Sequence, residues 1–88
     1  MTKSLKAKHA GTKLPPDPEG MNDNRAKWAR SAVRRFQRQT GTDRGTAVSD
    51  LLCDLMHFCD REGFDFRAEL ETATMHYKAE TSEVETAA

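Results

Sequence analysis

The chain has 88 residues, of which 36% are hydrophobic and 32% are charged, and its formal net charge is zero. This length excludes more than one domain, and this composition permits a small helical fold that has little core to spare. No apolar run reaches about 18 residues, and residues 1–11 lack the apolar run of a secretion signal, so we expect a cytoplasmic protein that makes no membrane contact.

The net charge of zero conceals two strongly charged halves. Residues 1–38 hold ten bases against three acids, a charge of +7, whereas residues 39–88 hold four bases against eleven acids, a charge of −7. A separation of this kind steers encounters with charged partners, so it favours a function in binding.

The first 20 residues form the least structured part of the sequence. They end in a run that contains Pro15, Pro16, Pro18 and Gly20, which cannot continue a helix. We therefore expect residues 1–20 to be a disordered, basic, proline-rich tail, residues 21–80 to be the folded domain, and residues 81–88 to be a disordered acidic tail.

The first predicted helix spans residues 23–39. Cap-type residues at 22–24 precede it, and Gly41 suits its C-terminal cap. Its apolar residues gather on one side of the helical wheel. Its other side carries four cations at i, i+3, i+7 and i+11, namely Lys27, Arg30, Arg34 and Arg38.

Two more helices complete an all-α, three-helix prediction. The second spans residues 44–62, with Thr42 or Asp43 as its cap, and apolar residues cover half of its circumference, so we expect it to be central with neighbours on two sides. The third spans residues 66–80 and begins after Asp65, with one narrow apolar stripe. Because the core is small, pairing with a second copy, a homodimer, is a natural remedy.

The basic stripe is the leading candidate for a partner-binding site. Cations repeated along a rigid helix can contact phosphates or an acidic protein surface, and a solvated helix face is the plainer interpretation. The residues that we assign to partner binding are Lys27, Arg30, Arg34, Arg38, Arg35 and Trp28. For Trp28 we favour a role in sealing the core, with a contact to a base or a protein as the alternative.

The acidic residues of the second helix offer a second, alternative surface. Asp50, Asp54 and Asp60 can imitate nucleic acid and occupy the basic groove of a host protein. Asp50, Asp54 and His57 also have a spacing that can bind a divalent metal, as in small all-α nucleotide pyrophosphohydrolases, but the second acidic pair of those enzymes is missing. We therefore predict no metal site, no cofactor and no catalytic residue.

Three smaller features complete the candidates. Cys53 and Cys59 lie too far apart around a helix to bond to each other, so we expect both to be reduced thiols and Cys59 to be a core residue. On the back of the third helix, Ala68, Met75 and Ala79 form a modest apolar spot that is a candidate for self-association or docking.

Several stretches of the sequence resemble small uncharacterised helical proteins that are encoded on proteobacterial phages, plasmids and genomic islands. The resemblance rests on residues 49–66, 68–70, 75–77 and 16–22. It carries no mechanism to any residue of this chain. It implies a mobile-element context, in which small proteins are frequently regulators or inhibitors that act by binding.

The sequence thus leads to one main hypothesis and two alternatives. The main hypothesis is a non-enzymatic protein that binds a partner protein through a charged helical surface and modulates or inhibits it. The first alternative is a nucleic-acid-binding protein that uses the same stripe with Lys3, Lys6, Lys8 and Lys13, and the second is the acidic mimic. An enzyme would require that the domain bind Mg²⁺ or Mn²⁺ and hydrolyse a nucleotide.

Overall fold

The computed structural model describes residues 13–82, and this part of the chain contains three helices and no strand. Helix α2 spans Asn22–Thr40, α3 spans Ala47–Glu62 and α4 spans Phe66–Glu80. The all-α, three-helix prediction is confirmed, and the bounds of α4 agree with the expected 66–80. The predictions for residues 1–12 and 83–88, which include Lys3, Lys6 and Lys8, lie outside the described residues.

The N-terminal cap of α2 differs from the predicted one, which lay at residues 22–24. The N-cap is Met21 and makes no side-chain cap bond; instead, the Asp17 carboxylate accepts the N–H of Asn22 at 3.0 Å. Gly20, at φ 76°, donates its N–H to the Asp17 carbonyl at 3.1 Å and closes the turn that brings this carboxylate into place. The end of the proline-rich segment therefore caps the helix, because it supplies an acceptor to one of the free N–H groups of the first turn.

Helix α3 begins three residues later than predicted. The Asp43 carboxylate accepts the N–H of Thr46 at 3.0 Å and its hydroxyl at 3.3 Å, and residues 44–46 form a turn instead of the first turn of the helix. The helix ends as expected at Gly63, which is left-handed at φ 84° and donates to the Cys59 carbonyl at 3.0 Å. Asp65 caps α4 as predicted, because its carboxylate accepts the N–H of Ala68 at 3.1 Å.

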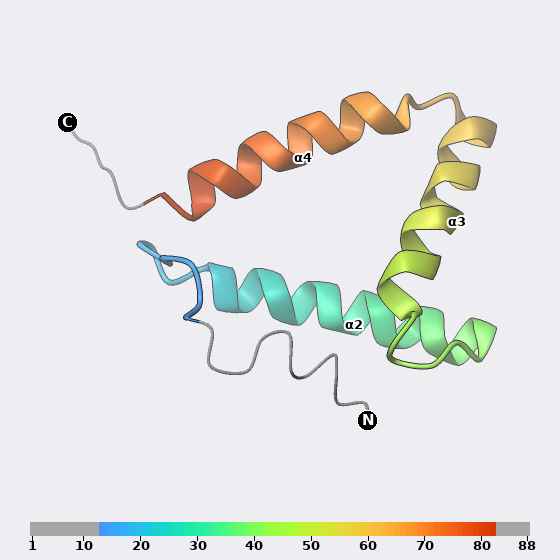
Figure 1. Ribbon diagram of the computed structural model, residues 1–88, viewed down its shortest axis with the longest axis horizontal. Helices are drawn as coiled ribbons and strands as arrows, with labels where there is room; N and C mark the ends of the chain where they lie inside the picture. The colour runs from blue at the N-terminus through green and yellow to red at the C-terminus, as the bar shows by residue number, and fades with distance from the viewer. Residues whose placement is uncertain (1–12, 83–88) are drawn as a thin grey trace.

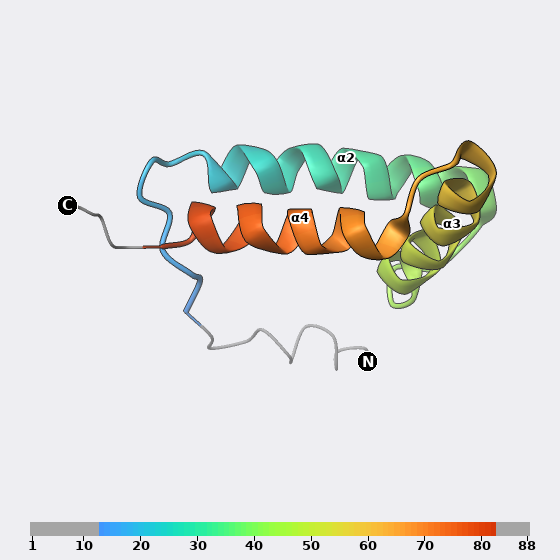
Figure 2. The same ribbon diagram turned by 90° about the horizontal axis from the view of Figure 1, so that it is seen from above.

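The three helices lie along the sides of a triangle (Figure 1). Helix α3 packs against both α2 and α4, which confirms that it is the central helix. Helices α2 and α4 run in opposite directions and come together at one end only (Figures 1 and 2). At the third corner, the Asn22 side-chain amide donates to the Glu80 carbonyl at 2.8 Å, and Arg25 Nε lies 3.4 Å from Glu80 Oε2. We call this pair of contacts the α2–α4 clasp.

The helices meet at the corners of the triangle and bury little between them. Among residues 13–82, Ala47 and Cys59 are the buried apolar residues, with 1% and 7% of their surface exposed, and no large side chain is fully buried. The rings of Phe58 and Phe64 stack at the α3–α4 corner with centroids 6.0 Å apart, yet about half of each side chain is exposed. Within residues 13–82, the core is therefore confined to the corners of the triangle.

Candidate functional site

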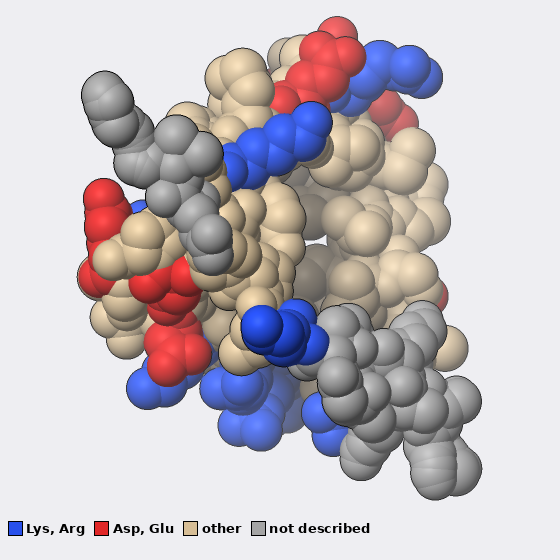
Figure 3. All heavy atoms as spheres, turned by 60° about the vertical axis from the view of Figure 1, so that its left-hand side comes forward, with Lys and Arg blue, Asp and Glu red and all other residues tan. Residues whose placement is uncertain are grey.

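The basic face of α2, which we define as Lys27, Arg30, Arg34 and Arg38, is fully open to a partner. All four side chains are exposed, and none forms an ion pair with an acid of residues 13–82. Arg25, which points toward α4, is instead half-buried and paired with Glu80. Figure 3 shows Lys and Arg atoms gathered along the lower edge of the molecule, at the height of α2.

Trp28 and Arg35 lie on the flank of α2, between the basic face and the apolar side of the helix. The prediction that Trp28 seals the core is wrong, because 63% of this residue is exposed. Helix α4 reaches α2 only at its first residues, near Asn22 and Arg25, and does not extend over Trp28. The exposed ring of Trp28 therefore offers apolar surface on the flank of the basic face.

The three candidate acids do not form one line. Asp50 and Asp54 lie one turn apart on the polar side of α3 and are exposed, whereas Asp60 lies at the α3–α4 corner and lines a groove there. Within residues 13–82, no group of three or more His, Cys, Asp or Glu residues is placed to hold a metal ion. Arg61 donates to the main-chain carbonyl of His57 at 3.3 Å, so this hydrogen bond involves the backbone of His57 and not its imidazole ring.

A second surface is apolar and faces the centre of the triangle. The α2–α4 clasp shows which sides of these two helices face each other, and the stripe of α4 that contains Glu80 also contains Tyr77 and Leu70. On α2, the stripe that contains Arg25 continues to Phe36. Tyr77 and Leu70 are 57% and 49% exposed, because α2 and α4 meet at the clasp and not along their length.

Helix α3 contributes the third side of this surface. Around the helix, Val48, Leu52 and Leu55 lie on the same half of the circumference as the buried Ala47 and Cys59, yet 61%, 45% and 40% of these residues are exposed. Figure 3 shows an opening between walls that are mostly free of charged side chains. We define the inner apolar face by its large residues, Phe36, Val48, Leu52, Leu55, Leu70 and Tyr77.

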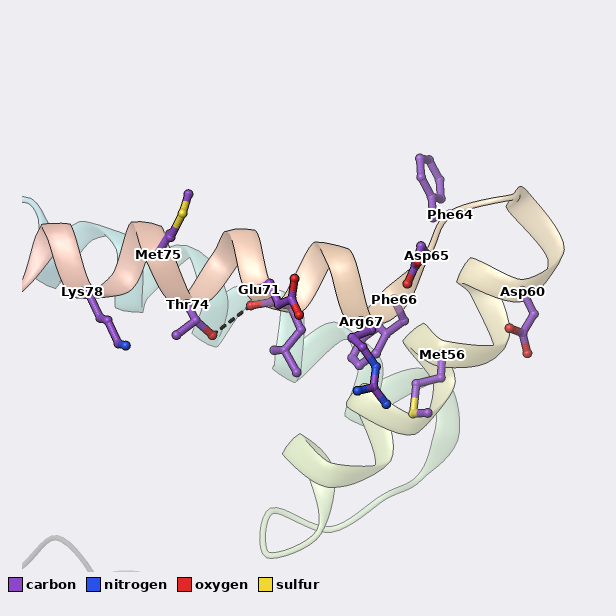
Figure 4. A pocket seen from close by; sticks show the side chains of 11 residues that line it. Met56, Asp60, Phe64, Asp65, Phe66, Arg67, Glu71, Thr74, Met75 and Lys78 are labelled. Atoms are coloured by element: carbon purple, nitrogen blue, oxygen red, sulfur yellow. Dashed lines mark hydrogen bonds between the residues drawn. The ribbon is translucent and has the colours of Figure 1, made fainter.

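An open groove of about 920 Å³ lies along the α3–α4 corner. Its apolar lining includes Met56, Phe66 and Met75, and charged side chains border it; in Figure 4, Lys78 and Thr74 point to one side of α4 and Met75 to the other. The Thr74 hydroxyl donates to the Leu70 carbonyl at 2.9 Å and is thus already engaged. The lining is typical of a contact surface, because no set of polar groups converges on one point within it.

Sequence reasoning found only part of this groove. It singled out Met75 with Ala68 and Ala79 as an apolar spot, and all three are exposed. It missed Met56 and Phe66 as members of the same groove. Met56 comes from α3, across a corner whose angle helical periodicity does not specify, and Phe66 lies on the other side of α4 from Met75.

The two cysteines differ in reactivity. Both are free, as expected, with Cys53 exposed and Cys59 buried. Burial raises the pKa of the Cys59 thiol, and the carboxylates of Glu69, Asp60 and Asp65 raise it further. Because the thiolate is the reactive form, Cys59 has less of it than an ordinary cysteine at any given pH.

We therefore expect iodoacetamide at mildly alkaline pH to label Cys53 well before Cys59. Peptide mass spectrometry of the singly labelled chain checks this order. Equal labelling under native conditions would contradict the buried position of Cys59, and labelling in urea, where both thiols are exposed, is the control.

Comparison with known proteins adds no relative. No family model matches the chain, and neither a curated protein sequence nor a solved structure matches it. Over residues 13–82, no helix combines the length and the hydropathy that crossing a bilayer requires.

Proposed function

We propose that this protein is a non-enzymatic interaction protein that binds an acidic surface of a partner protein through the basic face of α2 and thereby modulates or inhibits that partner. The observation that supports the proposal is that four exposed cations on one rigid helix have no acidic partner within residues 13–82. A helix holds such cations in fixed register, which favours fast and selective association with a complementary charged surface.

The flank of the basic face supports a protein as the partner. Trp28, 63% exposed, lies on the same stripe of α2 as Arg35, two turns away, and tryptophan and arginine are among the residue types that most often dominate the energy of protein interfaces. An exposed aromatic ring next to a row of arginines thus provides an apolar anchor within an electrostatic contact.

Nucleic acid is the second candidate for the same face, because phosphates also attract repeated cations. The exposed acids of α3 and α4 oppose it, since they would repel a long polyanion that extended beyond α2. The acidic mimic has weaker support, because Asp60 lies apart from Asp50 and Asp54.

The test reverses the charge of two residues at the centre of the basic face. The variant Arg30→Glu with Arg34→Glu should lose capture of the partner from a bacterial lysate, with an affinity lower by about a hundredfold or more, because both contacts become repulsive. Its circular dichroism should match that of the wild type, since neither residue is buried. Pull-down followed by quantitative mass spectrometry measures the loss.

A matched control distinguishes an effect of the basic face from an effect of the net charge. Lys13→Glu with Arg44→Glu changes the net charge by the same amount at two exposed positions outside the helices and should retain the partner. Equal loss in both variants would contradict a site on α2. A mobility shift of duplex or single-stranded nucleic acid that weakens steeply with salt, and disappears in the Arg30/Arg34 variant, would favour nucleic acid instead.

A further inference from the structure

We propose that a second copy of this chain covers the inner apolar face, so that the protein is a homodimer whose core is shared between the two copies. The starting observation is how small the core is within the described part of one copy. Among residues 13–82, the buried apolar residues are a small alanine and a cysteine, Ala47 and Cys59, each next to a corner of the triangle. A domain of this size requires far more burial to offset the entropy of ordering its chain.

The exposed apolar area of the inner apolar face fits a standard dimer interface. Five of its six residues, Val48, Leu52, Leu55, Leu70 and Tyr77, are 40% to 61% exposed. At roughly 200 Å² for each whole side chain, they leave on the order of 500 Å² of apolar surface in water. A standard interface takes about 800 Å² from each partner, of which about 55–65% is apolar, so this face supplies about the apolar area that one partner contributes.

The number of packed layers of secondary structure also indicates that the core is incomplete. Stable domains have at least two packed layers of secondary structure around one core. Here the three helices surround an opening, with contacts at the corners, so the part of the chain that the structure describes contains no layer that covers the opening (Figures 1 and 3).

The composition of α3 favours a large and permanent interface. Between Ala47 and Cys59, one half of its circumference consists of apolar residues alone, while Asp50 and Asp54 lie on the other half. Interfaces of obligate homodimers resemble a domain core cut in two, with charged residues depleted at their centre.

A second copy of the chain would cover the inner apolar face of both molecules at once. A two-fold interface uses the same patch on each subunit, so each copy covers the apolar surface that the other exposes. The net charge of zero removes the long-range repulsion that a strongly charged chain has toward its own copies. The basic face of α2 lies on a different side of its helix from Phe36, so dimerisation leaves that face open.

The test is the mass of the full chain in solution. Light scattering coupled to size exclusion should give twice the 9.9 kDa of one chain, and the unfolding temperature should rise over a roughly hundredfold increase in protein concentration. Because this measurement uses the wild-type chain, it needs no folded variant.

A matched pair of variants locates the interface. Leu55→Asp places a carboxylate in the centre of the inner apolar face and should weaken association by at least about thirtyfold. Cys53→Asp places the same residue two positions away, on the opposite side of α3 where Cys53 is exposed, and should leave the dimer intact.

A helical wild-type chain that keeps the mass of a monomer at every concentration overturns the proposal, whether terminal residues of the same chain or another protein then covers the face. Equal weakening by both variants also overturns the assignment to this face. Neither result bears on the proposed function, because the Arg30/Arg34 variant does not alter the inner apolar face.

Discussion

Replacing Ala47 by glutamate should leave the chain largely unfolded at room temperature. Ala47 is 1% exposed at the start of α3, next to its contact with α2, so no space exists there for a longer side chain. Glutamate would either bury a charge without a partner or force the two helices apart. We expect a loss of about 3 kcal/mol or more, which is a large share of the stability of a small domain.

Far-UV circular dichroism and urea titration measure this loss. The control is Ser49→Glu, which introduces the same residue two positions later on the same helix, where the side chain is exposed. The control should unfold at nearly the wild-type urea concentration. A stable Ala47→Glu variant would show that α2 and α3 do not meet at this residue.

The second large effect is expected from replacing Gly63 by valine. Gly63 ends α3 at φ 84°, a conformation that a β-branched residue adopts only with strain, and its N–H bonds to the Cys59 carbonyl. Nothing lies within 4 Å of a Cβ at this position, so the cost arises from the backbone and not from a clash. We expect a loss of about 1–2 kcal/mol in the free energy of unfolding.

Gly45→Ala is the matched control for this variant. Gly45 lies in the turn before α3 and does not have a positive φ, so alanine should be neutral or slightly stabilising there. Urea unfolding of both variants beside the wild type gives the comparison. If both substitutions had the same effect, the left-handed cap at Gly63 would not be what turns the chain from α3 toward α4.

Local signals in the sequence were sufficient to predict the elements of the fold. Asp65 and Gly63 mark the start of α4 and the end of α3, because a carboxylate acceptor and a left-handed glycine act within a few residues of their position. The same kind of local chemistry explains the error at the start of α3. Asp43 has two ways to use its carboxylate, as a helix cap or within a turn, and it closes a turn onto Thr46.

The site was predictable only in part. Periodicity places Lys27, Arg30, Arg34 and Arg38 on one face, and the structure confirms that all four are exposed. Periodicity also identifies an apolar side of α3, but not what covers it, and much of this side stays exposed within residues 13–82. The exposure of Trp28 was missed for the same reason, since the position of α4 relative to α2 depends on contacts between residues far apart in the sequence.

The α2–α4 clasp has a consequence for the motion of the chain. It joins residues 58 positions apart through one hydrogen bond and residues 55 positions apart through one partly exposed ion pair, so it closes a long loop with little energy. These contacts contribute on the order of 1 kcal/mol, which corresponds to roughly a sixth of the molecules with this corner open at any moment. We therefore expect helix α4 to pivot about the Gly63 corner when the clasp opens, which would widen the opening at the centre of the triangle.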